Sequence, residues 1–252
     1  MAYSKYPPKL YTPGQTESFK LSRSKIDFYY ECPRCFYLDR RFGVSRPSIP
    51  SFTLNSAVDA LFKKEFDLLR AKGEAHELMK HYHIDAIPFK HPKMDEWREN
   101  FVGVQYLHPA TNFTVFGAVD DIWVEPSGRL LVVDYKSTST DREISLDDQY
   151  KQGYKRQMEI YQWLLTNNGF EVSPTGYFVF ANASKNKPSF DGKLEFELSI
   201  IPYTGNGYWI EQILLDIKTC LDSDKLPNFS PTCEYCQYTK NRLTATRQFQ
   251  TS

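Results

Sequence analysis

Three aspartates and a lysine stand close together in the stretch GAVDDIWVEPSGRLLVVDYKS. Asp134 and Lys136 are two residues apart, so on a β-strand their side chains share a face. Carboxylates are the hard oxygen ligands that Mg²⁺ prefers, and a bound cation of this kind can activate water for phosphodiester hydrolysis. A neighbouring lysine can stabilise the charge that develops at the phosphate. The pattern therefore indicates metal-dependent phosphodiester hydrolysis, with the backbone carbonyl of Tyr135 as a further candidate ligand.

The second carboxylate is either Asp120 or Asp121, and the turn between the two strands decides between them. Residues 126–128 read Pro-Ser-Gly and fit a three-residue hairpin loop, with Gly128 in the left-handed backbone region. That loop places Asp120 opposite Asp134, whereas a two-residue loop would shift the register by one and favour Asp121. Because a glycine stands where the longer loop needs one, we predict that Asp120 is the second carboxylate.

The residues before Asp134 argue against a plain surface hairpin. Residues 130–133 read Leu-Leu-Val-Val and are apolar on both faces, which is typical of a buried strand. An aspartate and a lysine at the end of a buried strand need a partner or a function. The alternative, surface acids beside a solvated lysine, fits this pattern less well.

The periodicity of the sequence predicts the elements that must hold these residues. We expect a short helix within 22–42, with a start signal at Ser24 and Asp27, and a region of further helix and loop at 73–110. The long helix at 51–72 should bury a face with Ala57, Leu61, Leu68 and Leu69. Further helices are expected at 147–168 and 210–221, and strands at 113–125, 129–137, 175–183 and 193–202.

Four short motifs in this order resemble the PD-(D/E)XK nuclease superfamily. They are YECPRCFYLDRRFG, GAVDDIW followed by VVDYKS, RQMEIYQW and CEYCQY, and together they span about residues 22–240. Within the superfamily the chain is similar to the RecB-like exonucleases, including the CRISPR-associated iron–sulfur members. The resemblance implies an α/β restriction-endonuclease-like core, with a mixed central sheet flanked by helices. We accordingly expect a flexible lead-in at 1–20, one nuclease-like domain at 21–240 and a tail at 241–252.

The resemblance also assigns roles to individual residues. It implies that Asp120 and Asp134 bind Mg²⁺ or Mn²⁺ and that Lys136 acts at the phosphate. It implies further that Gln157 and Tyr161 line the active site. These last two lie one helical turn apart, so they share a helix face, although plain helix packing would also explain Tyr161.

One motif of the family departs from its usual form. Where the RecB-like nucleases have Gly-xxx-His on an early helix, this chain has Asn55 and Asp59. An aspartate can still ligate a hard cation, so Asp59 is a candidate metal ligand. A solvated helix acid is an equally good interpretation, and Glu65 is a weaker candidate on the same helix.

Two CxxC pairs lie near opposite ends of the chain. Cys32 and Cys35 form one pair, and Cys233 and Cys236 form the other. Four thiolates suit Zn²⁺ or an iron–sulfur cluster, and we expect them to clip the N- and C-terminal segments together. The spacing alone favours zinc, while the resemblance favours a [4Fe–4S] cluster. The resembled nucleases, however, carry one cysteine early and three late, and Arg242 stands where the last would be.

The composition limits the classes of function. The formal net charge is 0 with 41% hydrophobic residues, which fits a globular domain better than a non-specific, strongly basic nucleic-acid coat protein. The sequence shows no secretory signal and no apolar run long enough for a membrane helix. CxxC pairs suit a reducing compartment, so we expect a cytoplasmic location.

The expected partner is DNA, either single strands or ends, in repair or recombination. Candidate phosphate contacts are Arg34, Arg40, Lys155 and Arg156. Two other functions stay open. One is a catalytically weak or inactive nucleic-acid-binding module of the same fold, and the other is a structural or partner-binding protein.

Overall fold

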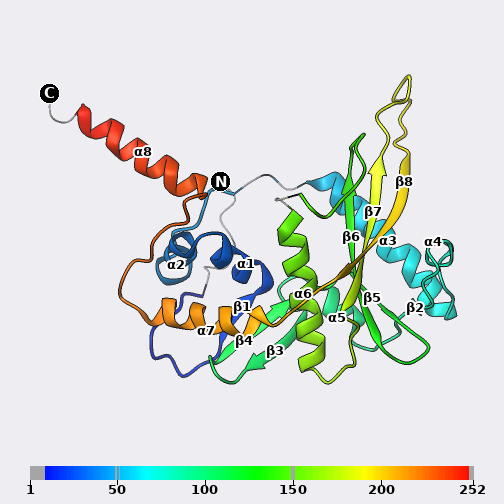
Figure 1. The fold of residues 1–252 in the computed structure, drawn as a ribbon, viewed down its shortest axis with the longest axis horizontal. Helices are drawn as coiled ribbons and strands as arrows, with labels where there is room; N and C mark the ends of the chain where they lie inside the picture. The colour runs from blue at the N-terminus through cyan, green and yellow to red at the C-terminus, as the bar shows by residue number, and fades with distance from the viewer. Residues whose placement is uncertain (1–8, 49, 51, 149–150, 250–252) are drawn as a thin grey trace. The chain divides into compact units, whose positions relative to one another are not determined.

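The computed structural model describes residues 9–48, 50, 52–148 and 151–249 (Figure 1). Residues 1–8 of the expected lead-in, Ser51 at the expected helix start and residues 149–150 lie outside this range. The chain divides into two compact units. The terminal unit comprises Met1–Ile49, Leu107–Thr114 and Ile210–Ser252, and the sheet unit comprises Pro50–Tyr106 and Val115–Trp209.

A mixed five-stranded sheet forms the centre of the sheet unit and confirms the predicted α/β class. Its order is β2-β5-β6-β7-β8, with β6 in the middle, parallel to β7, and every other pair antiparallel. The strands are β2 Ile87–Pro88, β5 Asp121–Val124, β6 Leu130–Thr138, β7 Thr175–Ala183 and β8 Phe196–Thr204. The apolar run of residues 130–133 is buried throughout, as its sequence predicts.

The hairpin between β5 and β6 has the register that a three-residue loop predicts. Asp121 pairs with Val133, so Asp120 stands opposite Asp134 in the same register. Gly128 closes the loop with a φ of 88°, in the left-handed region that favours glycine. β5 pairs with β6 only through residue 133, whereas β6 continues to Thr138 against β7. The second half of β6 therefore has an edge that β5 does not cover.

The helix α3 (Thr53–Lys72) packs on one face of this sheet, through a different set of residues from the predicted one. Phe62 and Phe66 are buried, and Phe62 stacks on Tyr135 with ring centroids 4.9 Å apart. Leu61 and Leu68, which we expected on the buried face, are exposed. The two aromatic side chains offer more apolar area than leucines, and they determine which face of the helix is buried.

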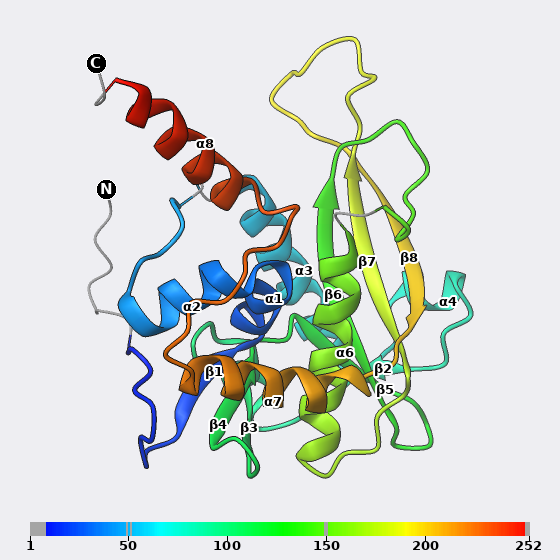
Figure 2. The ribbon, with the colours of Figure 1, turned by 60° about the vertical axis from the view of Figure 1, so that its left-hand side comes forward.

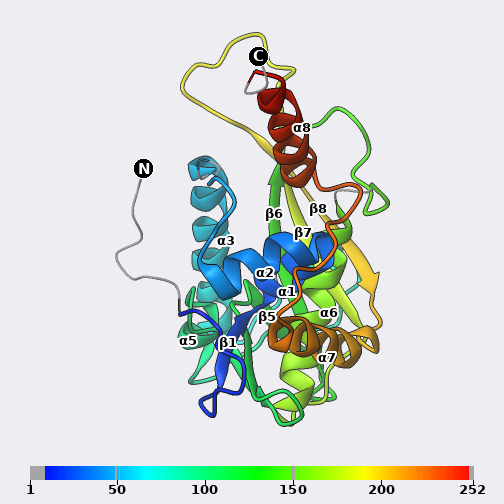
Figure 3. The same cartoon turned by 90° about the vertical axis from the view of Figure 1, so that its left-hand side faces the viewer.

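The helix α6 (Gln152–Asn167) covers the opposite face, so the sheet lies between α3 and α6 (Figure 2). The same arrangement is visible edge-on in Figure 3. A Cβ on Gly176 of β7 would stand 2.3 Å from the sulfur of Met158, so the glycine permits this close helix–strand approach. α6 ends just before Gly169, the residue predicted to end the helix, which has a φ of 88°. The helix begins at Gln152, later than the expected residue 147.

The stretch 113–125, which we expected to be one strand, breaks into two. β4 (Phe113–Gly117) belongs to a three-stranded sheet of order β1-β4-β3, and β5 belongs to the five-stranded sheet. A Cβ on Gly103 would lie 2.3 Å from the carbonyl oxygen of Gly117, so two backbones meet closely where the chain leaves the first sheet. The region 73–110 also contains strands β2 and β3 (Val104–His108), besides the short helices α4 (Glu77–His81) and α5 (Met94–Arg98).

The terminal unit gathers the two ends of the chain. It contains β1 (Phe19–Ser22), α1 (Arg23–Glu31), α2 (Pro33–Phe42), α7 (Trp209–Asp222, from Ile210 on) and α8 (Glu234–Gln248). The side chain of Ser22 caps α1, two residues before the expected start signal, and a second helix follows directly. α7 contains the helix predicted at 210–221 and buries Ile210, Leu214, Ile217 and Leu221.

Two features of the terminal unit bear on the expected boundaries. Within the expected lead-in, Tyr11 and Phe19 are buried, and the Tyr11 hydroxyl donates to Asp222 Oδ1 at 2.6 Å. α8 runs through residue 240, where we expected the tail to begin. Within the described ranges, no helix is both long enough and apolar enough to cross a membrane.

Candidate active site and metal centre

Asp120, Asp134 and Lys136 come together at the uncovered edge of β6. Asp134 is fully buried, and the Lys136 ammonium forms an ion pair with its Oδ2. Asp120, immediately before β5, accepts a hydrogen bond at Oδ2 from the Tyr135 backbone N–H at 3.0 Å. With Asp59 and Lys63 of α3, these residues make up what we call the carboxylate cluster, and all of it lies within the sheet unit.

The environment of Asp134 opposes a bare negative charge. Burial, with a contribution from nearby Asp120, raises the pKa of Asp134 to about 7, although Lys136 acts in the other direction. Its Oδ1 accepts a hydrogen bond from Gln157 Nε2 at 2.8 Å. Its Oδ2 is buried and faces the ion-paired ammonium of Lys136. A buried carboxylate oxygen in this state is suited to a cation.

Lys136 is held between an anion and an aromatic face. Burial works against its charge, but Asp134 and Asp120 outweigh burial and raise the pKa of Lys136. Its Nζ lies 4.6 Å from the ring centroid of Tyr154 on α6, a cation–π contact. Lys136 is therefore a fixed positive charge beside the two carboxylates.

Gln157 and Tyr161 reach the same place from α6. The Gln157 amide nitrogen donates to Asp134 Oδ1 and, at 3.1 Å, to the Tyr161 hydroxyl. Because both contacts come from one amide group, the Gln-xxx-Tyr spacing fixes the orientation of the Asp134 carboxylate. Tyr161 itself is almost fully buried, which agrees with a positioning role for its hydroxyl.

The helix α3 brings Asp59 to the cluster, together with a lysine that the sequence analysis missed. Lys63 Nζ lies 2.8 Å from Asp59 Oδ2 and 3.3 Å from Asp120 Oδ1, and so bridges the two carboxylates. Burial raises the pKa of Asp59, and the charge of Asp120 raises it further. The spacing of four residues between Asp59 and Lys63 was the available signal, since it is typical of helix ion pairs. Glu65, the weaker candidate, instead contacts His76 at 2.9 Å.

Asp121 serves a different purpose on the other face of β5. It is fully buried and accepts a hydrogen bond from the Tyr135 hydroxyl at 2.6 Å. The guanidinium groups of Arg70 and Arg98 form ion pairs with it. The adjacent aspartates are thus separated by strand alternation into one residue of the carboxylate cluster and one buried structural anion.

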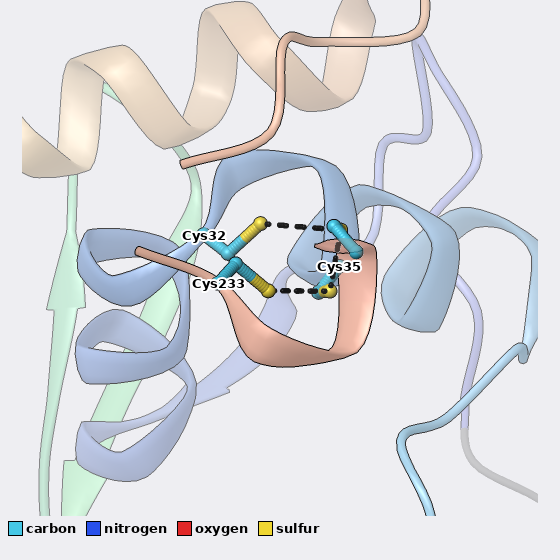
Figure 4. Close-up of side chains that lie close together, drawn as sticks. Cys32, Cys35 and Cys233 are labelled. Carbon is cyan, nitrogen blue, oxygen red and sulfur yellow. Dashed lines mark hydrogen bonds between the residues drawn. The ribbon is translucent and has the colours of Figure 1, made fainter. Parts of the chain in front are cut away.

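The four cysteines of the two CxxC pairs converge in the terminal unit and confirm the predicted clip between its N- and C-terminal segments. All four sulfurs lie within 4.8 Å of one another. The Cys35 sulfur is 3.6 Å from that of Cys233 and 3.4 Å from that of Cys236, while the Cys32 and Cys236 sulfurs are 3.8 Å apart. Figure 4 shows the labelled side chains pointing toward one another from α2 and from the C-terminal segment.

An arginine lies against this sulfur cluster. Arg46 donates from Nη2 to the Cys233 sulfur at 3.4 Å, and its guanidinium lies 4.5 Å from the Phe28 ring centroid and 4.7 Å from that of Tyr235. Hydrogen bonds to the Cys32 sulfur outweigh burial and lower its pKa to about 7. Burial raises the pKa of the Cys35 and Cys236 thiols, so the partly buried guanidinium and the lowered pKa of Cys32 favour negatively charged sulfur, the form that binds metal, at only part of the cluster.

The candidate DNA contacts are mostly engaged with neighbouring protein groups. Arg34 donates to the Pro227 carbonyl at 2.8 Å, and Arg40 pairs with Asp39 at 2.6 Å. Lys155 Nζ lies 3.5 Å from Asp147, and Arg156 is half-buried on α6. Arg34 and Arg40 therefore contribute to packing inside the terminal unit.

Comparisons with known proteins bear on these observations. A search of curated protein sequences finds no significant match. Among solved structures, one described as the crystal structure of SSO0001 is similar, with a TM-score of 0.37 and 16% identity over 89% of this chain and 86% of that chain. The model of the PD-(D/E)XK nuclease superfamily matches residues 53–240, which include the whole carboxylate cluster together with Gln157 and Tyr161. The chain therefore belongs to the PD-(D/E)XK nuclease superfamily, whose members are mostly phosphodiester-hydrolysing nucleases.

Proposed function

We propose that the protein is a metal-dependent DNA nuclease that acts in repair or recombination in the cytoplasm. The observation that carries the proposal is the convergence of the buried Asp134 carboxylate, Asp120 and Lys136 at the end of β6 that β5 does not cover. The carboxylate cluster holds three carboxylates and two ammonium groups, so a bound cation would offset the remaining negative charge. The PD-(D/E)XK membership supplies the reaction class.

In this proposal the residues of the chain divide the work. Asp120 and Asp134 would hold Mg²⁺ or Mn²⁺, with Asp59 and the Tyr135 carbonyl as further ligands. The bound cation supplies an activated water and neutralises phosphate charge. Lys136 places a fixed positive charge beside the reacting phosphate.

Gln157 and Tyr161 would act as positioning residues. The amide of Gln157 donates to Asp134 at 2.8 Å and thereby prevents the carboxylate from rotating away from the cation. The hydroxyl of Tyr161 accepts from the same amide at 3.1 Å and fixes its orientation. Lys155 and Arg156, on the same helix, remain candidates for phosphate contacts.

The test is cleavage of end-labelled DNA by the full-length protein. Single-stranded, duplex and RNA oligonucleotides of one sequence should be compared with Mg²⁺, with Mn²⁺ and with EDTA. We expect cleavage of DNA that requires either divalent ion. Cleavage that persists in EDTA, or no cleavage of any substrate with either ion, would contradict the proposal.

One observation favours the alternative of a weak or inactive nucleic-acid-binding module. The ammonium of Lys63 lies between Asp59 and Asp120, where it competes with a metal for the same oxygens. Lys63→Met should discriminate between the two functions. If the protein is an active nuclease, the variant should need less Mg²⁺ for half-maximal cleavage rate. If it is an inactive module, neither the wild type nor the variant should cleave DNA.

We also propose that the four cysteines bind a single zinc ion rather than a [4Fe–4S] cluster. A tetrahedral site with zinc–sulfur bonds of about 2.3 Å separates its sulfurs by about 3.8 Å. Three of the sulfur–sulfur distances, at 3.4, 3.6 and 3.8 Å, agree with that spacing. A cubane cluster places an iron between each thiolate and its centre, which would force the four sulfurs farther apart.

Metal analysis of the purified protein tests this assignment. We expect about one zinc per chain and no iron above trace, with a colourless protein even after anaerobic purification. Iron in stoichiometric amounts, with a brown colour, would overturn the zinc assignment and favour the cluster. Reduced cysteines of this kind also fit the reducing cytoplasm.

A further inference from the structure

A groove of about 590 Å³ lies beside the carboxylate cluster in the sheet unit. One wall is the first turns of α3, with Leu54, Asn55 and Val58, and another is residues 137–139 at the end of β6. The third wall comes from the long hairpin between β7 and β8, from Ala183 to Phe196. That hairpin projects beyond the sheet in Figure 1.

The groove and the carboxylate cluster share a helix face. Asn55 lines the groove, and Asp59 follows one turn later on α3, so both side chains lie along one side of the helix. Asp59 contacts Lys63, which in turn reaches Asp120. On β6, Thr138 in the groove wall is two residues from Lys136, so the two side chains share a face of the strand. A ligand that fills the groove would therefore continue toward the candidate active site.

The chemistry of the walls combines cations and hydroxyls with apolar surface. The hairpin contributes Lys185, Lys187 and Lys193, and the end of β6 contributes Ser137, Thr138 and Ser139. None of the described residues that line the groove is acidic, although the formal net charge of the protein is 0. The apolar portion includes Leu54, which is 60% exposed, and Phe190, which is 74% exposed.

A tight turn in the hairpin connects Phe190 and Lys193 of the groove lining. Lys193 N–H donates to the Phe190 carbonyl at 2.9 Å, which closes a four-residue turn. Its central residues, Asp191 and Gly192, have φ values of 44° and 66°, the left-handed pair typical of a tight hairpin turn. Lys185 and Lys187 form exposed ion pairs with Asp141 and Glu195, which contribute little and can yield to phosphate.

We propose that this groove binds single-stranded nucleic acid next to the phosphate that is cleaved. The lysines and hydroxyls would hold the backbone phosphates, and Phe190 would stack on an unpaired base. A duplex does not fit this chemistry as well, because its bases are already stacked and only its backbone faces outward. The proposal rests on the nuclease function proposed above, and it specifies single-stranded nucleic acid as the substrate of that active site.

Binding can be measured separately from cleavage. Fluorescence anisotropy of a labelled oligo(dT) strand and of a labelled duplex, both with full-length protein in EDTA, gives affinities without hydrolysis. We expect Phe190→Ala to weaken single-strand binding by about tenfold, the usual cost of one lost stacking contact, with duplex binding unchanged. The matched control is Tyr208→Ala, which removes another aromatic side chain, 90% exposed, from the sheet unit.

A second variant tests the phosphate contacts through their salt dependence. Replacing Lys185, Lys187 and Lys193 together with alanine should weaken single-strand binding and flatten the slope of log affinity against log salt by about 2. The charge-matched control replaces Lys64, Lys72 and Lys80, which are exposed and lie outside the groove. Thermal unfolding of each variant checks that the fold is kept.

The outcomes separate the groove from the nuclease function. If the wild-type protein cleaves DNA but the groove variants bind single strands as tightly as the controls, the groove proposal fails and the nuclease function stands. If single-strand binding falls as expected while no substrate is cleaved, the groove stands and the nuclease function fails. Equal losses for single strands and duplex would also overturn the single-strand assignment.

Discussion

The carboxylate cluster and the four-cysteine site are both suited to a metal, but they are built in opposite ways. The carboxylate cluster offers hard oxygens, and the Asp59 and Asp120 side chains keep 34% and 21% of their surface exposed. The cysteine site offers four soft sulfurs, of which those of Cys32, Cys35 and Cys233 belong to buried residues. The first site is partly open to solvent, and most of the second is buried.

The difference in exposure between the two sites indicates a different role for each. A closed set of four protein ligands leaves no coordination position for a reactant, so a metal there would contribute mainly to folding. An open set of carboxylates beside a fixed lysine leaves room for water and a phosphate. Variants at the first site should therefore change rates, and variants at the second should change stability.

Asp134→Asn should give the largest effect on rate. The substitution removes a ligand charge but keeps the shape of the side chain, so cleavage should fall by about a thousandfold or more. The midpoint of thermal unfolding should stay close to that of the wild type. A parallel loss of rate and of folded protein would contradict the separation of roles, because it would make Asp134 a structural residue.

Cys233→Ser should show the opposite pattern. Loss of one sulfur ligand should release zinc and lower the free energy of unfolding by roughly 4 kcal/mol, as loss of a structural metal does. Cleavage by the protein that remains folded should change little. The measurements are zinc content, chemical denaturation and specific activity, and unchanged stability after zinc loss would refute a structural role.

Asp121→Asn extends the comparison to two adjacent residues, Asp120 in the carboxylate cluster and the buried Asp121. This change leaves Arg70 and Arg98 beside a neutral amide in a buried place, which should cost about 3 kcal/mol of folding stability. Its cleavage rate, measured below the unfolding transition, should stay within a fewfold of the wild type. A rate loss as large as that of Asp134→Asn would mean that both aspartates serve the chemistry.

Asp59→Ala should give the smallest effect. Removal of a peripheral ligand should raise the Mg²⁺ concentration for half-maximal cleavage by about tenfold, equivalent to about 1.4 kcal/mol of binding free energy. The saturated rate should change little, and titration of cleavage against Mg²⁺ measures both quantities. An unchanged titration would show that Asp59 is only an ion-pair partner of Lys63.

Much of the fold could be predicted because local rules decided it. Gly128 determined the loop, and the loop determined that Asp120 rather than Asp121 stands opposite Asp134. The Gln-xxx-Tyr spacing brought Gln157 and Tyr161 to one helix face. Two CxxC pairs could be expected to meet, because a zinc ion or an iron–sulfur cluster takes four thiolates and each pair supplies two.

The remaining features depend on contacts distant in sequence. Lys63 and Arg46 become parts of their sites only because other segments bring Asp120 and Cys233 beside them. The break between β4 and β5 follows from the approach of Gly103 to Gly117, which no periodicity reveals. α8 was missed because it is polar all round, so it has no apolar stripe to detect.

The central claim is that the carboxylate cluster hydrolyses DNA with a divalent metal, and Lys136→Met tests it most directly. Met keeps the length of the side chain and removes only the charge beside Asp134. Cleavage of end-labelled DNA in Mg²⁺ or Mn²⁺ should be abolished in the variant and present in the wild type, with no product from either in EDTA. Thermal unfolding and zinc content should show that the variant is folded with its cysteine site intact. Full cleavage by a folded Lys136→Met protein would contradict the account.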